Sequence, residues 1–217
     1  MSNTTPIPLL ILGAGTFAQD VADLVGDIAG YEVAGFVVSV PPYQPGAGLL
    51  GKPVYWVDDA RQLAGRCQAL SAIGSTRRAA FVAQMGGFGF KFATLVHPMA
   101  RVSRAATLGA GTLVGPGAII SAYTEVGRHV IINRGALIGH HGKIGDGATI
   151  SPGANLAAEV TVGARAYVGM GAVVVEKHSI GELSLVGAAS LVTRDVPPRT
   201  VVMGVPARVV KENIDGY

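Results

Sequence analysis

Two adjacent histidines, His140 and His141, are the residues of this sequence best suited to acid–base chemistry. An imidazole titrates near neutral pH, so it can take a proton from an amine or hydroxyl and later return it. Ala122 and Ala158 occur eighteen residues before and after His140, and such small neighbours would leave room beside its ring. The arrangement predicts a general base for the transfer of an acyl group.

A second candidate is the turn Gly13-Ala14-Gly15-Thr16-Phe17-Ala18, which matches the phosphate-binding pattern G-x-G-x-x-A. It follows an apolar run and precedes a segment with helical spacing, so backbone N–H groups would face an anion there. Gly13, Gly15 and Thr16 are therefore candidates for binding a sugar or sugar nucleotide. The alternative is a glycine-rich turn that serves only close packing.

The histidines lie in a six-residue repeat that runs from residue 96 to residue 195. Every sixth residue is aliphatic, without insertion: Val96, Val102, Leu108, Val114, Ile120, Val126, Ile132, Ile138, Ile144, Ile150, Leu156, Val162, Val168, Val174, Ile180, Val186 and Val192. This period predicts a parallel β-helix with three short faces per coil, so that one coil takes eighteen residues. His140 and His141 then fall where the chain turns a corner.

Residues 1–95 follow a different pattern. Strand-like runs at IPLLILGAG, YEVAGFVVS, VYWV and ALSAIGS alternate with helix-like segments at FAQDVADLVGDIAG, DDARQLAGR and RRAAFVAQMGGFG. This alternation indicates a small α/β domain, Rossmann-like, with a parallel sheet. We therefore predict two domains: a Rossmann-like α/β domain over residues 1–95, whose glycine turn makes it the candidate for binding the acceptor, and a β-helix domain with a C-terminal tail over residues 96–217, which carries the candidate base.

Composition narrows the functional classes. The sequence is 49% hydrophobic and only 14% charged, which indicates a packed core and not disorder. A net charge of +3 from scattered residues gives no nucleic-acid-binding patch. No apolar stretch approaches the ~20 residues of a membrane helix, and the N-terminus lacks the basic segment of a secretory signal. We expect a cytoplasmic protein that binds neither nucleic acid nor membrane.

Other catalytic chemistries have less support in the sequence. The single cysteine, Cys67, lies outside the repeat, so a covalent acyl-enzyme is not expected and direct transfer in a ternary complex is favoured. A zinc site of the β-helix carbonic anhydrase type needs three histidines that include a His-x-x-x-x-His pair, which is missing. We expect no metal, and we expect backbone N–H groups at the corners to stabilise the oxyanion.

The whole chain resembles the bacterial sialic-acid O-acetyltransferases and nucleotide-amino-sugar N-acetyltransferases, a family of hexapeptide-repeat acyltransferases. The similarity rests on the segments LLILGAGTFAQDVADL, GFVV, AIGSTRR, FATLVHPMARVS, VIINRGALIGHHGKIGD and VTRDVPPRTVVMGVPARVV. The resemblance implies a left-handed β-helix, a homotrimer, and acetyl-CoA in the groove between neighbouring helices. It places the catalytic base on His140 and the active-site asparagine on Asn133. It places the residues that line the acetyl-CoA groove on Thr149, Ala158 and Gly204.

The sequence departs from this family at two places. His141 stands where the family usually has an Asp or Glu that orients the base. Val37-Val38-Ser39 stands where the family usually has an acidic pair that contacts the nucleotide. The first departure bears on the strength of catalysis, and the second on the nucleotide part of the acceptor.

Our main hypothesis is acetyl-CoA-dependent N-acetylation of a nucleotide-linked amino sugar by direct transfer, with His140 as the base. One alternative is O-acetylation of a sialic-acid-like sugar. Another is acylation of a non-sugar acceptor such as an amino acid or an antibiotic. A non-enzymatic alternative is a trimeric β-helix scaffold that kept the fold.

Overall fold

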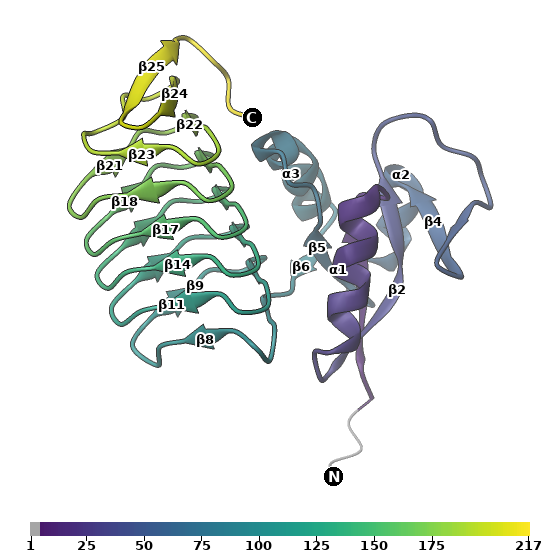
Figure 1. The fold of residues 1–217 in the computed structure, drawn as a ribbon. Helices are drawn as coiled ribbons and strands as arrows, with labels where there is room; N and C mark the ends of the chain where they lie inside the picture. The colour runs from purple at the N-terminus through teal and green to yellow at the C-terminus, as the bar shows by residue number, and fades with distance from the viewer. Residues whose placement is uncertain (1–4) are drawn as a thin grey trace. The chain divides into compact units, whose positions relative to one another are not determined.

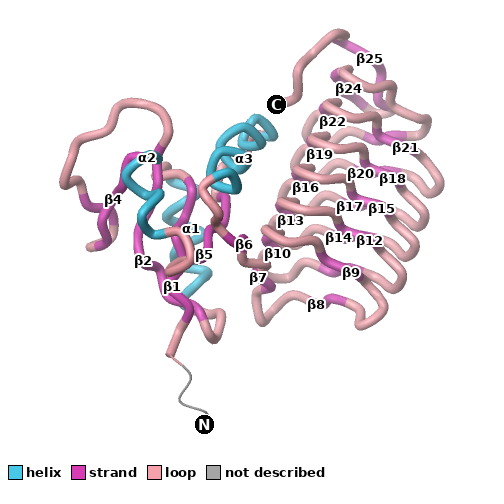
Figure 2. The backbone as a smooth tube through the Cα atoms, turned by 180° about the vertical axis from the view of Figure 1, so that it is seen from behind, coloured by secondary structure: helices cyan, strands magenta, loops and turns pink. Residues whose placement is uncertain are grey.

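The chain folds into two compact units in a computed structural model that describes residues 5–217. The first unit comprises residues 5–74 and 78–95, and the second comprises Ser75–Arg77 and Val96–Tyr217 (Figures 1 and 2). Ser75–Arg77 belong to the second unit because the Tyr217 carbonyl accepts hydrogen bonds from Thr76 Oγ1 (3.2 Å) and Arg77 N (3.3 Å). Among the described residues, no helix is long and apolar enough to cross a membrane.

The first unit is built on a six-stranded sheet with the order β3-β4-β2-β1-β5-β6. Its strands are β1 (Ile7–Leu12), β2 (Tyr31–Val38), β3 (Gly48–Leu49), β4 (Lys52–Trp56), β5 (Gln68–Ser71) and β6 (Lys91–Phe92). Neighbouring strands run parallel, except that β3 and β4 are antiparallel. The helices are α1 (Thr16–Gly26), α2 (Val57–Ala60) and α3 (Ala79–Gly87), and short 3₁₀ turns occur at η1 (Arg61–Leu63) and η2 (Thr76–Arg78).

The alternation of strands and helices expected for this unit is confirmed. Two strands were not expected, β3 and β6, because two residues are too few to show an alternating pattern. The helix expected to open at Asp58 is one turn, α2, that starts at Val57 and continues as η1. A segment this short gains few helical hydrogen bonds for the cost of nucleation, which explains the early end.

The buried core of the first unit determines where its loops can bind a ligand. Leu10 and Leu12 of β1 are fully buried, and so are Val37 of β2 and Met85 of α3. Strand β1 lies between β2 and β5, and the chain leaves the ends of β1 and β5 toward opposite sides of the sheet. In open α/β sheets, ligands bind outside the carboxyl ends of the strands at such a switch point.

The second unit is a left-handed parallel β-helix made of three stacked sheets of two-residue strands (Figure 1). The first sheet contains β7 (Leu95–Val96), β10 (Leu113–Val114), β13 (Ile131–Ile132), β16 (Thr149–Ile150), β19 (Tyr167–Val168) and β22 (Leu185–Val186). The second contains β8 (Arg101–Val102), β11 (Ile119–Ile120), β14 (Leu137–Ile138), β17 (Asn155–Leu156), β20 (Val173–Val174) and β23 (Leu191–Val192). The third contains β9 (Thr107–Leu108), β12 (Glu125–Val126), β15 (Lys143–Ile144), β18 (Thr161–Val162) and β21 (Ser179–Ile180).

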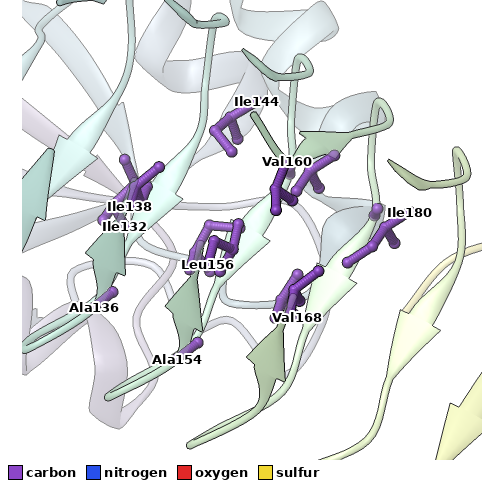
Figure 3. Close-up of a cluster of buried hydrophobic side chains, with 14 of the residues drawn as sticks. Ile132, Ala136, Ile138, Ile144, Ala154, Leu156, Val160, Val168 and Ile180 are labelled. Atoms are coloured by element: carbon purple, nitrogen blue, oxygen red, sulfur yellow. The ribbon is translucent and has the colours of Figure 1, made fainter. Parts of the chain in front are cut away.

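The six-residue period is confirmed as the basis of this fold. Each aliphatic position of the repeat is the second residue of a strand, and it pairs with the position eighteen residues away: Ile120 with Ile138, and Ile138 with Leu156. These side chains point inward and form one continuous buried cluster with alanines such as Ala136 (Figure 3). The interior therefore holds the coils in a single register.

The C-terminal end of the helix carries an antiparallel hairpin of β24 (Val201–Gly204) and β25 (Ala207–Lys211), which joins the first sheet beside β22. Just before it, His178 occupies a position that small residues hold in other coils. Its ring lies half-exposed, with Nδ1 3.3 Å from Asp195 Oδ1. The backbone N–H of Ser179 and the His178 ring donate to this carboxylate and lower the pKa of Asp195. The His178 ring points out of the β-helix to make this contact, so it takes up no space in the narrow interior.

His129 is a corner residue whose side chain turns inward. It is half-buried, with its Nδ1 atom out of contact with solvent. Its ring occupies the space that the missing side chain of Gly111 leaves one coil below. A glycine eighteen residues away thus decides whether a corner side chain can turn inward.

Close approach between coils predicts different costs for two glycine substitutions. A Cβ at Gly145 would lie 2.6 Å from the backbone N of Ala164, whereas a Cβ at Gly142 meets nothing closer than 3.4 Å. Because backbone atoms cannot move aside, we expect Gly145→Ala to reduce the free energy of unfolding by about 1–3 kcal/mol. The control Gly142→Ala should leave it unchanged or raise it. Denaturant unfolding followed by circular dichroism compares the two, and equal losses would contradict the packing argument.

Candidate active site

The paired histidines occupy the corner between β14 and β15, as the repeat predicted. The backbone fixes this corner from both sides: His141 N donates to Ala122 O (3.0 Å), and Glu159 N donates to His140 O (2.9 Å). The coil below adds a bond from Thr124 Oγ1 to Gly139 O (2.8 Å). Both imidazoles are exposed. The corner therefore presents two titratable rings on a rigid backbone.

The two imidazoles contact each other through their δ nitrogens. His140 Nδ1 lies 2.9 Å from His141 Nδ1, and the ring planes are nearly perpendicular at 88°. A hydrogen bond between two δ nitrogens requires that one carries the proton and the other accepts it. The contact therefore links the tautomer of one ring to that of the other.

The histidine corner lacks glycine at the position that needs a left-handed backbone. The residues with positive φ there are Tyr123 (60°), His141 (58°), Glu159 (62°) and Lys177 (63°). The corner between the first and second sheets uses glycine at the same step, at Gly117, Gly135, Gly153 and Gly171. A left-handed conformation costs a side-chain-bearing residue roughly 1–2 kcal/mol. The corner between the third and first sheets also has side-chain-bearing residues at this step, at His129, Arg165 and Leu183, so the conformation alone does not single out the histidine corner.

Tyr123 is a site residue that our reading of the sequence missed. It lies eighteen residues before His141, and its ring stacks on the His141 ring with centroids 4.9 Å apart and planes 36° apart. The phenol side chain is 62% exposed. The eighteen-residue register would have found it, because the same step from His140 leads to Ala122.

Ala158 lies at the histidine corner one coil beyond His140, in the position expected from the repeat. The residue is half-buried, and its carbonyl accepts a hydrogen bond from Lys177 N (3.0 Å). Its own N–H makes no hydrogen bond to any residue that the structure describes. An unused backbone donor beside an imidazole is an arrangement that can stabilise a developing oxyanion.

Three other expected site residues lie away from this corner. Asn133 is half-buried at the start of the corner between β13 and β14, so strand β14 separates it from His140. Thr149 belongs to β16 of the first sheet and is 1% exposed. Gly204 is exposed at the end of β24, with φ of 101°. Within one chain, the structure brings His140, His141 and Ala158 together and leaves Asn133, Thr149 and Gly204 on the side of the first sheet.

The glycine turn lies at the carboxyl end of β1, at the switch point of the sheet. Gly13 N donates to Val37 O (2.8 Å), and a Cβ on Gly13 would come within 3.2 Å of Ile73 Cγ1. Gly15 precedes α1 as its N-cap without a side-chain cap, and Thr16 is the first, exposed residue of that helix. The space around Gly15 is open for 4 Å. The turn can therefore present helix N–H groups to an anion.

Arg78 adds positive charge to the same edge of the first unit, and our reading of the sequence did not single it out. Its side chain is 2% exposed, and Nη1 contacts the carbonyl of Ile73, the residue that packs against Gly13. Burial lowers the pKa of the Arg78 guanidinium to about 10, so it stays charged at neutral pH. A buried cation behind a glycine turn favours a ligand that carries phosphate.

Neither unit contains a cluster suited to a metal: among residues 5–217, no group of three His, Cys, Asp or Glu side chains could hold an ion. At the end of β2, Val37 is buried and its carbonyl is used by Gly13. The polar groups of the candidate sites are thus imidazoles, backbone amides and a guanidinium.

No protein-family model matches the chain, and no curated protein matches it either. The chain does match solved structures. The chain is similar to perosamine N-acetyltransferase from Caulobacter crescentus in complex with CoA and GDP-perosamine, with 32% identity over 94% of this chain and 97% of that chain (TM-score 0.86).

Two further solved structures match over almost their whole length. The acetyltransferase domain of PglB from Neisseria gonorrhoeae, in complex with acetyl coenzyme A, is 27% identical over 95% of this chain and 100% of that chain (TM-score 0.86). WeeI from Acinetobacter baumannii is 25% identical over the same shares (TM-score 0.84).

Proposed function

Since the chain belongs to the family of hexapeptide-repeat sugar N-acetyltransferases, we propose that it acetylates the amine of a nucleotide-linked amino sugar with acetyl-CoA as the donor. The observation that carries this proposal is the exposed histidine pair beside the unused N–H of Ala158. An amide-forming acyl transfer needs a base and an oxyanion donor, and this corner offers both. The similarity to a relative solved with CoA and GDP-perosamine supports the choice of donor and acceptor.

His140 acts as the general base in this proposal. Its Nδ1 is engaged with His141, so Nε2 is the nitrogen left for the acceptor. Nε2 takes a proton from the amine while the new C–N bond forms at the acetyl carbon. The C–S bond then breaks and the same proton returns to the thiolate, which yields an amide and a free thiol. No acyl-enzyme is needed, because the reaction is a direct transfer between two bound substrates.

The residues of this corner fit a thioester. Acetyl-CoA, when bound, supplies the carbonyl whose oxygen becomes negative in the transition state. The N–H of Ala158, which has no partner within residues 5–217, would donate to that oxygen. Ala122 and Ala158 carry only methyl groups beside His140 and leave space for the acetyl group. Gly204 is exposed and would line the groove from a neighbouring copy of the chain, whereas Thr149 is buried within its own chain at 1% exposure.

We propose that this neighbouring copy belongs to a homotrimer. The outward side chains of the second sheet include Ile119 (38% exposed), Leu137 (38%) and Val173 (40%), which form an apolar face. His140 lies at one edge of this face and Asn133 at the other. Cyclic packing of three copies on such faces would bring Asn133 of one copy toward His140 of the next, and it would complete a site that one chain holds only in part.

Assembly can be tested with a charge on this face. Leu137→Glu should give a monomer in light scattering and lose most activity, because a carboxylate would be buried without a partner in the interface. The matched control is Thr161→Glu, at the corresponding outward position of the third sheet, which should remain a trimer. A stable monomer of the unmodified chain at micromolar concentration would count against a shared site.

The first unit would hold the acceptor through the turn at Gly13 and Gly15, where Thr16 starts α1. The open space at Gly15, the helix N-terminus and the charged Arg78 support the binding of a diphosphate at this edge. No acidic side chain stands at Val37-Val38-Ser39. Phosphate groups, more than the base of the nucleotide, would thus determine the affinity.

Gly15→Val tests this acceptor site. The side chain would enter open space, so the fold should persist, but it would fill the room above the helix N-terminus. We expect a raised KM for the acceptor and an unchanged affinity for acetyl-CoA. Steady-state kinetics with a nucleotide-linked amino sugar, beside calorimetry with acetyl-CoA, measures both. An unchanged acceptor KM would assign the turn to packing alone.

Substitution of the histidines tests the chemistry. His140→Ala should lower kcat by ~10²–10⁴, the usual contribution of a general base, and leave acetyl-CoA affinity unchanged because the ring is not needed to hold the donor. His141→Ala should cost far less, because it removes only the group that orients the base. Both variants should keep the circular dichroism spectrum of the parent. Equal losses, or a larger loss in His141→Ala, would make His141 the base.

A further inference from the structure

Tyr123 places an aromatic ring against the histidine pair where nothing in the packing of the helix requires one. The residue is 62% exposed and its backbone has φ of 60°, so it has neither burial nor backbone preference in its favour. A left-handed backbone costs tyrosine roughly 1–2 kcal/mol relative to glycine. Glu159 and Lys177 adopt the same conformation in the same corner, so the case for Tyr123 rests on the contact of its ring with His141.

The ring of Tyr123 packs against the ring of His141. The ring centroids lie 4.9 Å apart, and the bond from His141 N to Ala122 O (3.0 Å) fixes the spacing of the two corners. His141 is itself exposed and strained, with φ of 58°. Stacking of an aromatic ring on an imidazole restricts its rotation, so Tyr123 limits the orientations that His141 can take.

The orientation of His141 matters because it determines the tautomer of His140. A base that works through Nε2 must carry its proton on Nδ1, and that proton must go to an acceptor. The atom within reach is His141 Nδ1, at 2.9 Å. A neutral His141 must then be unprotonated at Nδ1, which accepts this proton, and protonated at Nε2. His141 thus orients the ring of His140 without a negative charge, as a carboxylate orients the catalytic histidine in other enzymes.

Other ionisable groups surround the pair without pairing with it. Glu125 of β12, Lys143 of β15 and Glu159 of the next corner lie on the neighbouring strands and coil. Within residues 5–217, neither histidine forms an ion pair with a carboxylate, and the His141 ring has a hydrogen bond with His140 and a ring contact with Tyr123. Inside one chain, the contact between the two δ nitrogens is therefore the hydrogen bond that orients His140.

From this geometry, and resting on the proposed function, we propose that Tyr123 is a positioning residue. Its ring holds His141 with Nδ1 toward His140, and through His141 it keeps Nε2 of His140 free for the proton of the acceptor amine. The stacked ring, and not the phenol hydroxyl, performs this task. Tyr123 is thus a third member of the site, and it acts on the base without touching either substrate.

The test compares Tyr123→Phe with Tyr123→Ala. Tyr123→Phe keeps the ring and should retain the parent kcat. Tyr123→Ala should lower kcat by about one order of magnitude, below the ~10²–10⁴-fold loss of a general base itself, with both KM values unchanged. The matched control is Lys177→Ala, another exposed residue with a left-handed backbone two coils beyond His141.

A double substitution makes the result decisive. If Tyr123 acts through His141, then Tyr123→Ala should cause no further loss in a His141→Ala background, because coupled residues are not additive. Additive losses, a raised acceptor KM in Tyr123→Ala, or an unchanged kcat in Tyr123→Ala would each overturn the proposal. Tyr123→Leu serves as a second variant if the alanine variant does not fold. Failure of the proposed function itself would show differently, as full activity in His140→Ala.

Discussion

The stacking of each inward aliphatic side chain on its counterpart eighteen residues away is the interaction on which the rest of the second unit depends. Ile120, Ile138 and Leu156 are one such series, and each belongs to a strand paired in parallel with the next. The stack fixes the register between coils, and the register decides which corner residues lie above one another. Ala158 stands over His140, and His141 over Tyr123, only because the apolar interior allows no slip.

This register also separates the two halves of the site. A two-residue strand links the corner of Asn133 to the corner of His140, and a rigid coil cannot bring its own corners together. The face between them is apolar, whereas the outward residues of the third sheet include Glu125 and Lys143. The fold thus favours a site assembled from copies over a site folded from one chain.

The sequence predicts the second unit more completely than the first, for a physical reason. Seventeen aliphatic positions at one period leave a single architecture, and the corner of His140 follows from counting. The strands β3 and β6 are too short to show a pattern, and the inward turn of His129 depends on Gly111 one coil away. Tyr123 was missed because an exposed aromatic residue looks ordinary until its neighbour in the register is considered. The expectations for Asn133, Thr149 and Gly204 came from the family resemblance, and within one chain these residues lie away from the His140 corner.

The corner column of His140 has a geometric property that follows from its regular spacing. Neighbouring strands lie about 4.8 Å apart, so Ala158, Glu176 and Arg194 stand one, two and three steps beyond His140 along the helix. Duplication or deletion of eighteen residues above His140 would keep every surviving contact in register while moving the β24–β25 hairpin by one step. The distance from the base to the end of the helix is therefore counted in whole coils. A ligand that spans from His140 to the end of the helix must therefore match a whole number of coils. The number of coils can change without a change in the chemistry at His140.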